Sequence, residues 1–268
     1  MTYNSFAKVN IYLKIVGTKD NYHLISSRFM IVNSLYDIIK FEKKEKMNDQ
    51  FELIGKFSCK TEQNIIYKAY KKLLLIDNIS KKVKDFFNTY KVTVVKNIPE
   101  FAGLGGGSSN AATFLTMCNN ILNLNLKKEK LNFISNSLGS DVTFFLEGFN
   151  SANVEGVGDK VAKFDEESLN LDILTPPIKC HTPSVYGQYR KFLLKNYDKI
   201  IKQNKLLSEK LNGLKSYEIL NSFSFQELND LYMSACILYP DIKNYADKNW
   251  FFSGSGSSFF RRKDWVKQ

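Results

Sequence analysis

The chain has 268 residues, of which 44% are hydrophobic, 14% aromatic and 24% charged, close to ordinary globular usage. This composition excludes a disordered, collagen-like or disulfide-stapled chain. At about 150 residues per domain, the length allows one large domain or two modest ones. The net charge of +11 favours anionic partners, but no Arg-rich patch or aromatic stacking motif accompanies it. We therefore expect no nucleic-acid partner.

The sequence predicts neither a membrane span nor an export signal. The longest charge-free stretch, residues 101–126, holds four glycines and five asparagines, too many for membrane insertion. The first residues lack a basic stretch followed by an apolar run. The four cysteines lie dozens of residues apart and form no metal-ligand pair. We expect a cytoplasmic protein with reduced thiols, no membrane partner and no resident metal site.

Strand and helix patterns are mixed in the first half of the chain. Residues 7–16 alternate apolar and polar side chains, which predicts a half-buried strand. Further strands are expected over 29–35, 37–41 and 90–95. Apolar residues at helical spacing predict a helix over 64–75.

The second half predicts short strands and separate helices. Strands are expected over 161–164 and 171–174, helices near 184–195 and 223–238, and two apolar runs around a glycine turn over 250–260. Residues 196–222 give no pattern from which a function follows. No repeat or low-complexity linker separates the halves, and we place a domain boundary near residue 150.

A glycine-rich loop, Gly103–Ala112, lies between a predicted strand and a helix-patterned segment. Glycines allow the backbone to approach a ligand closely, and the start of a helix offers unpaired N–H groups to an anion. These are properties of phosphate-binding loops. The loop matches neither the Walker A nor the G-x-G-x-x-G pattern, and the alternative interpretation is a flexible linker.

Three motifs resemble those of the galactokinase, homoserine kinase, mevalonate kinase and phosphomevalonate kinase (GHMP) superfamily. They are Ala7-Lys-Val-Asn10, the loop Gly103–Ala112 and Gly254-Ser-Gly256. Asn21-Tyr-His23 and the enlarged triple-glycine loop are similar to the branch that phosphorylates a cytidyl sugar alcohol. That branch commonly has Gly in place of Asn21, a mild change because Asn tolerates left-handed backbone.

The resemblance implies an α+β, two-domain GHMP-kinase-like fold with the active site in the interdomain cleft. Residues 1–150 would form the ATP- and phosphate-binding domain and residues 151–268 the α/β substrate domain. The reaction implied is transfer of the γ-phosphoryl group of ATP, with Mg²⁺ entering with ATP, to a hydroxyl of the cytidyl substrate in the non-mevalonate route to isoprenoids. A GHMP kinase acting on mevalonate or homoserine is the alternative enzyme. A basic nucleic-acid-binding module is the alternative class.

Two residues are the expected catalytic pair. In the resemblance Asp141 is the base that takes or orients the acceptor proton, and Lys8 stabilises charge. Alternation along the predicted strand puts Asn10 on the same face as Lys8, about 6–7 Å away. From the sequence alone, Lys8 could equally be a solvated charge and Asp141 a loop or helix-cap carboxylate.

The remaining site residues follow from the same resemblance. The expected substrate-binding residues are Asn10, Tyr22, His23, Phe29 and Tyr186, with cytosine lying between aromatic rings. The expected ATP- and phosphate-binding residues are Asn64, Lys96, Gly103, Leu104, Gly105, Gly106, Gly107, Ser108, Ser109 and Asn110. For Ser108 and Ser109 the alternative role is a helix cap without a ligand. The tyrosines could equally be core residues.

Overall fold

The computed structural model describes residues 1–245, 247 and 249–267. By its internal contacts the chain forms two compact units, each built from separate stretches of sequence. Unit 1 comprises residues 1–7, 35–98 and 106–148, and unit 2 comprises residues 8–34, 99–105 and 149–268. The boundary expected near residue 150 lies beside the last passage of the chain between the units. The expected assignment of ATP to residues 1–150 and of the acceptor to residues 151–268 stays a prediction.

Unit 1 is a small sheet with helices. Two long strands, β1 and β2, pair with each other and pass from one unit into the other. In unit 1, β2 pairs antiparallel with β4, and β3 pairs parallel with β4. The elements are β1 (Thr2–Lys19), β2 (Tyr22–Lys43), β3 (Leu53–Gly55), η1 (Thr61–Gln63), α1 (Ile65–Leu74), α2 (Asp77–Thr89), β4 (Tyr90–Val95), α3 (Gly106–Ile121), α4 (Lys128–Asn136) and α5 (Val142–Glu147).

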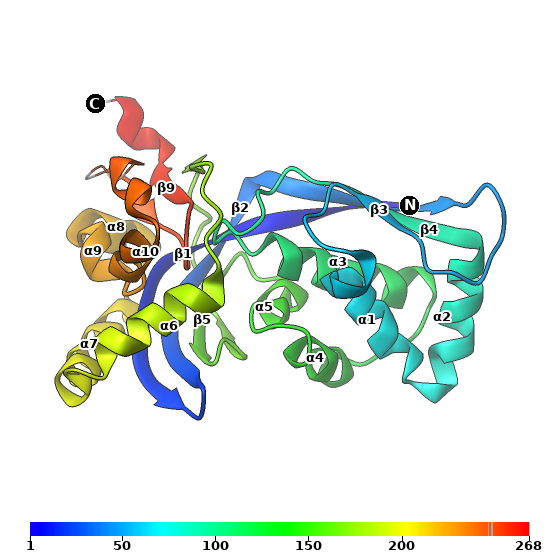
Figure 1. Cartoon of the computed structure of the whole chain (residues 1–268), viewed down its shortest axis with the longest axis horizontal. Helices are drawn as coiled ribbons and strands as arrows, with labels where there is room; N and C mark the ends of the chain where they lie inside the picture. Colours follow the sequence, from blue (N-terminus) through cyan, green and yellow to red (C-terminus); the bar gives the residue numbers. More distant parts are fainter. Residues whose placement is uncertain (246, 248, 268) are drawn as a thin grey trace. The chain divides into compact units, whose positions relative to one another are not determined.

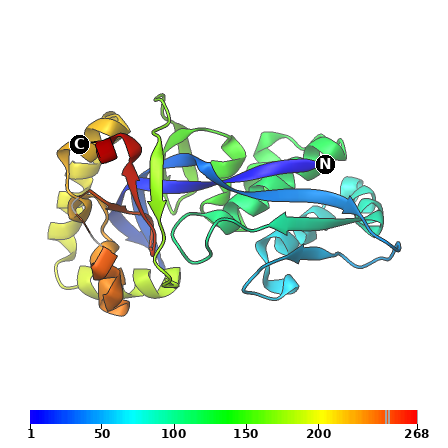
Figure 2. The ribbon, with the colours of Figure 1, turned by 90° about the horizontal axis from the view of Figure 1, so that it is seen from above.

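Aromatic side chains fill the core between these strands and helices. The helices of unit 1 lie on one side of strands β2 to β4, as Figures 1 and 2 show from two directions. Phe41 of β2, Phe87 of α2 and Phe114 of α3 are buried, with the Phe41 and Phe87 ring centroids 5.4 Å apart. Burial of each such ring contributes roughly 1.5–3 kcal/mol to folding. This core anchors the middle of α3 through Phe114, Leu115 and Cys118.

Unit 2 combines continuations of β1 and β2 with the C-terminal elements. There β2 pairs antiparallel with β5, and β5 with β6, while β7, β9 and β8 form a separate antiparallel sheet. The elements are β5 (Ser151–Gly156), β6 (Lys160–Lys163), β7 (Leu171–Leu174), α6 (Thr182–Leu193), α7 (Tyr197–Gly213), α8 (Ser216–Ser222), α9 (Phe225–Leu228), α10 (Tyr232–Leu238), η2 (Pro240–Tyr245), β8 (Phe251–Phe252), β9 (Phe259–Arg262) and η3 (Lys263–Lys267).

Most expected elements are present, with four corrections. The helix expected near 223–238 is two separate helices, α9 and α10. The prediction that β1 is half-buried is wrong, because its polar side chains Lys8, Asn10 and Lys14 are buried as well. The separate strands expected over 29–35 and 37–41 belong to one strand, β2. The left-handed backbone lies at Asp20, with φ of 53°, and not at Asn21.

Two further findings concern the described part of the chain as a whole. Within it, no helix is both long enough and apolar enough to cross a membrane. The four cysteines are all described, and each is a free thiol.

Candidate active site

Lys8 and Asn10 meet on the inward face of β1 in unit 2. The Lys8 ammonium donates to Asn10 Oδ1 at 2.6 Å and lies 4.4 Å from the centroid of the Phe29 ring. Asn10 Nδ2 donates in turn to Ser27 Oγ at 3.0 Å. The strand pair β1–β2 therefore brings together three of the predicted site residues, Lys8, Asn10 and Phe29, and holds the Asn10 amide in one orientation.

The three sequence motifs converge around Asn10. Its backbone N–H donates to Ser253 Oγ at 3.3 Å, and Ser253 Oγ donates to the carbonyl of Gly103 at 3.0 Å. The backbone N–H of Lys8 donates to the carbonyl of Leu104 at 3.0 Å. The first part of the glycine loop is therefore fixed to both β1 and the C-terminal glycine motif.

Gly103 is required at this junction. Its φ is +75°, and a Cβ there would lie 2.1 Å from the carbonyl oxygen of Ser253. Any other residue would have to displace backbone. Gly254, with φ of +56°, lies on the other side, where a Cβ would be 3.1 Å from the Gly103 carbonyl oxygen and 3.3 Å from Asn10 Oδ1.

The second part of the glycine loop opens helix α3 in unit 1. A Cβ on Gly107 would lie 3.8 Å from Ile65, the first residue of α1, and one on Gly139 would lie 3.8 Å from Ile65 and 3.9 Å from Ser108 Oγ. The starts of α1 and α3 are thus neighbours, with the turn before α5 beside them. Unpaired N–H groups at the start of α3 suit an anion.

Asp141 lies directly before α5, two residues beyond Gly139. It is the N-cap residue of α5, and its side chain makes no capping hydrogen bond to that helix. The carboxylate accepts a hydrogen bond from Ser140 Oγ at 3.4 Å. Asp141 is half-buried and shares a unit with Ser108 and the start of α3.

Other predicted ATP-binding side chains have partners within unit 1. Ser109 Oγ lies 2.8 Å from Ser5 Oγ, and Asn110 Nδ2 donates to Ser5 Oγ at 2.9 Å, so these two side chains point into the core. Asn64 caps α1, since its side chain accepts from the N–H of Ile66. Lys96 forms an ion pair with Asp37. Ser108 is the half-buried hydroxyl of the first turn of α3.

His23 lies against two tyrosine rings in unit 2. Its ring centroid is 5.3 Å from that of Tyr186 and 6.1 Å from that of Tyr189. Burial, with the nearby charge of Arg190, lowers the pKa of His23 below its usual value, so the imidazole is neutral at pH 7. Its Nε2 is buried without a hydrogen-bond partner. Tyr22, the next residue toward the N-terminus, is 67% exposed.

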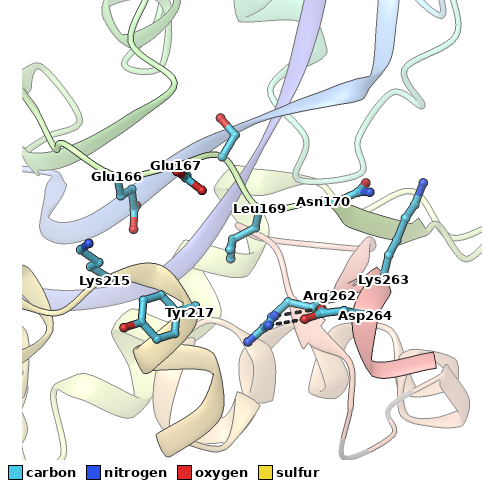
Figure 3. Close-up of a pocket in the computed structure, with 10 residues that line it drawn as sticks. Glu166, Glu167, Leu169, Asn170, Lys215, Tyr217, Arg262, Lys263 and Asp264 are labelled. Carbon is cyan, nitrogen blue, oxygen red and sulfur yellow. Dashed lines mark hydrogen bonds and ion pairs between the residues drawn. The ribbon is translucent and has the colours of Figure 1, made fainter. Parts of the chain in front are cut away.

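A hollow of about 720 Å³ lies elsewhere in unit 2, beside the loop that follows β6 (Figure 3). Polar and charged side chains line it, including Glu167, Lys215 and Arg262, which is paired with Asp264. No predicted site residue is among the residues that line this hollow. In the described part of the chain, no group of three His, Cys, Asp or Glu side chains is arranged to hold a metal ion.

Comparison with known proteins decides the family. Residues 64–149 match the GHMP kinases N terminal domain. The chain is 49% identical over 264 residues to 4-diphosphocytidyl-2-C-methyl-D-erythritol kinase of Sulfurimonas denitrificans, covering 98% of this chain and 97% of that one. The chain belongs to the 4-diphosphocytidyl-2-C-methyl-D-erythritol kinase family. It is therefore a GHMP kinase that acts on a small molecule, as the motifs predict.

Further relatives agree along nearly the whole chain. The kinase of the same name from Campylobacter jejuni serotype O:6 is 40% identical over 259 residues, 96% of this chain and 98% of that one. A crystal structure of 4-(cytidine 5'-diphospho)-2C-methyl-D-erythritol kinase has a TM-score of 0.67 at 24% identity, covering 98% of this chain and 90% of that one. A crystal structure of mevalonate kinase has a TM-score of 0.64 at 15% identity, covering 98% and 91%. The expected α+β GHMP-kinase fold is confirmed.

The structure also adds residues that the sequence analysis missed. Ser253 joins Asn10 to Gly103, Tyr189 lies against His23, and Asp37 pairs with Lys96. Two of them could have been found from the sequence, since Ser253 directly precedes the glycine motif and Asp37 is a charged residue inside an apolar run. Tyr189 is harder to find from the sequence, where the indication is that it follows Tyr186 by three residues on the same helix face.

Proposed function

We propose that this kinase transfers the γ-phosphoryl group of ATP to a hydroxyl of 4-diphosphocytidyl-2-C-methyl-D-erythritol, in the methylerythritol phosphate route to isoprenoid precursors. The proposal rests above all on the relatives of that name, at up to 49% identity over nearly the whole chain. The convergence of β1, the glycine loop and the Gly254 motif on Asn10 supports it, because a shared reaction needs a shared arrangement of motifs.

Asp141 is the proposed base and Lys8 the proposed charge-stabilising group. Phosphoryl transfer needs little covalent help from the protein, so positioning and charge neutralisation dominate. Asp141 would accept the proton of the acceptor hydroxyl as that oxygen bonds to phosphorus. Lys8, oriented by Asn10 and by the face of the Phe29 ring, would stabilise the negative charge of the transferring group.

The loop from Gly103 to Asn110 is the proposed cradle for the ATP phosphates, through backbone N–H groups at the start of α3. The buried Ser109 and Asn110 side chains would shape this loop from within unit 1. Lys96 and Asn64 are the proposed nucleotide-side residues. Mg²⁺ would enter with ATP, keep several waters and bind the Ser108 hydroxyl, a hard oxygen ligand of the kind it prefers, and would neutralise phosphate charge there.

The proposed cytosine site comprises Tyr22, His23 and Tyr186. A buried imidazole nitrogen without a partner is costly, and a hydrogen bond to a nucleobase edge would satisfy it. The Tyr186 ring beside His23 and the exposed Tyr22 ring offer faces for stacking. Cytosine presents an amino donor beside an acceptor nitrogen, whereas uracil presents a carbonyl beside N–H. Hydrogen bonds at His23 would therefore supply the base selectivity that stacking cannot.

An ADP-release assay over a panel of acceptors tests the function. The panel contains the cytidyl substrate, its uridyl analogue, methylerythritol phosphate without the nucleotide, mevalonate and homoserine. We expect efficient turnover of the cytidyl substrate alone. Equal turnover of methylerythritol phosphate would contradict the cytosine site, and turnover of mevalonate or homoserine instead would assign the chain to another GHMP acceptor. Salt-sensitive RNA retention without ADP release would favour the nucleic-acid-binding alternative. A cytoplasmic location, without a membrane or nucleic-acid partner, remains part of the proposal.

A further inference from the structure

A fully buried carboxylate, Asp37, lies in the part of β2 that belongs to unit 1. Its Oδ1 accepts the backbone N–H groups of Asn97 at 2.7 Å and Ile98 at 2.8 Å. Its Oδ2 accepts from the Lys96 ammonium and from Asn110 Nδ2, the latter at 2.8 Å. One carboxylate therefore holds three consecutive residues before the glycine loop and one residue from the first turns of α3.

The same group of side chains continues to the start of β1. Asn110 Oδ1 accepts from Lys96 Nζ at 3.2 Å, and Asn110 Nδ2 also donates to Ser5 Oγ at 2.9 Å. Ser5 Oγ lies 2.8 Å from Ser109 Oγ. The stretch before the loop, the first turns of α3 and the start of β1 are thus joined through Asp37, and each of these groups belongs to unit 1.

Lys96 occupies an unusual place for a cation. A Cβ built on Gly106, the first residue of α3, would lie only 3.5 Å from the Lys96 ammonium and 2.8 Å from Ile98 Cγ2. The start of a helix carries partial positive charge, so it repels an ammonium and attracts an anion. Asp37 supplies the negative charge that offsets this repulsion.

We propose that Asp37 is a positioning residue for ATP: it holds the Lys96 ammonium and the entry to the glycine loop where the phosphates bind. The inference rests on the proposed function, in which this loop binds ATP. Asp37 itself is fully buried and acts through Lys96, Asn110 and the backbone of residues 97–98.

The test compares Asp37→Asn with Lys96→Met and with the double variant, by calorimetry with the non-hydrolysable analogue AMP-PNP and with the cytidyl acceptor. We expect Asp37→Asn to weaken AMP-PNP binding at least 10-fold and to change acceptor binding less than twofold. Because Asp37 acts in part through Lys96, the double variant should lose less AMP-PNP affinity than the product of the two single losses. Asp230→Asn, at the buried Lys14–Asp230 pair of unit 2, is the matched control and should leave AMP-PNP binding within twofold of the wild type.

Several outcomes would overturn the inference. They are unchanged AMP-PNP affinity in a folded Asp37→Asn variant, equal weakening of both ligands, or losses that multiply in the double variant. If Asp37→Asn does not fold, the comparison of Lys96→Met with the double variant still tests the inference, because the Lys96 ammonium is absent from both. An AMP-PNP affinity that is a further 10-fold lower in the double variant than in Lys96→Met contradicts the inference. Wild-type protein that binds AMP-PNP but does not phosphorylate the cytidyl acceptor would refute the proposed function alone. Wild-type protein that does not bind AMP-PNP would refute both.

Discussion

Each unit contains a buried ion pair between a lysine and an aspartate, and the two pairs have different surroundings. In unit 1 the Asp37–Lys96 pair lies at the entry to the glycine loop, and the Lys96 ammonium reaches the first residue of α3. In unit 2 the Lys14–Asp230 pair is enclosed by protein groups: Lys14 also donates to the carbonyl of Glu227, and Asp230 accepts from the N–H of Ile15 and from Asn204.

The two pairs consist of the same residue types, so their surroundings decide whether a pair serves ligand binding, as proposed for Asp37–Lys96, or stability. Burial raises the pKa of Asp230, and the charge of Lys14 offsets part of that rise. Lys14–Asp230 joins β1 to residues 229–231, to α7 and, through the Tyr189 hydroxyl at 3.5 Å, to α6. Asp37–Lys96 joins the loop that is proposed to bind ATP. Loss of the Lys14–Asp230 pair should therefore lower the free energy of unfolding, whereas loss of the Asp37–Lys96 pair should weaken ATP binding.

The largest effect is expected at the enclosed pair. Asp230→Ala leaves the Lys14 ammonium buried without its carboxylate, and breaking a buried pair on one side costs about 3–5 kcal/mol of folding free energy. Urea unfolding followed by circular dichroism measures this loss. Replacing both partners, with Lys14→Met and Asp230→Leu together, should recover much of it. A loss below about 1 kcal/mol for Asp230→Ala would show that water reaches the pair.

The next largest effect is expected for the chemical step at Lys8 and Asp141. Lys8 is buried, and its ammonium donates to Asn10 and lies against the Phe29 ring. We expect Lys8→Met and Asp141→Asn each to lower kcat about 100-fold or more, the usual scale for positioned electrostatic and acid–base groups. Steady-state kinetics and thermal unfolding measure the two properties separately. Near-normal kcat with unchanged unfolding would remove that residue from the chemistry.

A smaller effect is expected where two neighbouring glycines differ in the space around them. A Cβ at Gly106 would lie 2.8 Å from Ile98, so Gly106→Ala must displace the Asp37-bound segment and should weaken ATP binding about 10-fold together with stability. A Cβ at Gly107 would make an ordinary contact at 3.8 Å with Ile65. Gly107→Ala should therefore raise helix stability by about 0.5–1 kcal/mol. Calorimetry with ATP then measures whether the added methyl group hinders the approach of the phosphates. An unchanged ATP affinity would place the phosphates away from Gly107.

The smallest effect concerns pH. Because the pKa of His23 is lowered in the folded protein, its contribution to stability is complete above the unfolded value near 6.5 and is lost as pH falls through the folded value. Affinity for the cytidyl substrate should be constant between about pH 7 and 8 and should fall a few-fold below 6.5. His23→Asn should flatten this profile, whereas His181→Asn, at the other histidine, should not. An unchanged profile in His23→Asn would assign the dependence to another group.

The sequence predicts the helices and strands better than it predicts the contacts of their polar side chains. Alternation over residues 7–16 correctly predicts the strand, but periodicity cannot show that a second layer covers its polar face. Here that layer includes Ser253 and Asp230, more than 200 residues away in the chain. The same holds for Asp37, whose partners arrive from residues 96–98 and 110.

Helix α7 shows why residues 196–222 gave no recognisable pattern in the sequence. Its buried positions, Ile201, Asn204, Ser208 and Leu211, have helical spacing, but two of the four are polar. Asn204 is buried because its amide donates to the carbonyl of Ile15 and to Asp230. A hydrophobic-periodicity search loses a helix whose inner face is polar. The motifs that carry the family resemblance, by contrast, were readable because they are short and continuous.

The chain crosses from unit 2 to unit 1 inside the glycine loop, at residues 105–106. This crossing has a consequence for the order of folding during synthesis. All segments of unit 1 are present once residue 148 has left the ribosome. Unit 2 must wait for β8 and β9, because Asn10 and Gly103 take their partner Ser253 from the segment that links these two strands. Until Ser253 has been synthesised, α3 can be formed while the preceding glycines lack their anchor. A nascent chain stopped before residue 251 would therefore carry a folded first unit and an unanchored glycine loop.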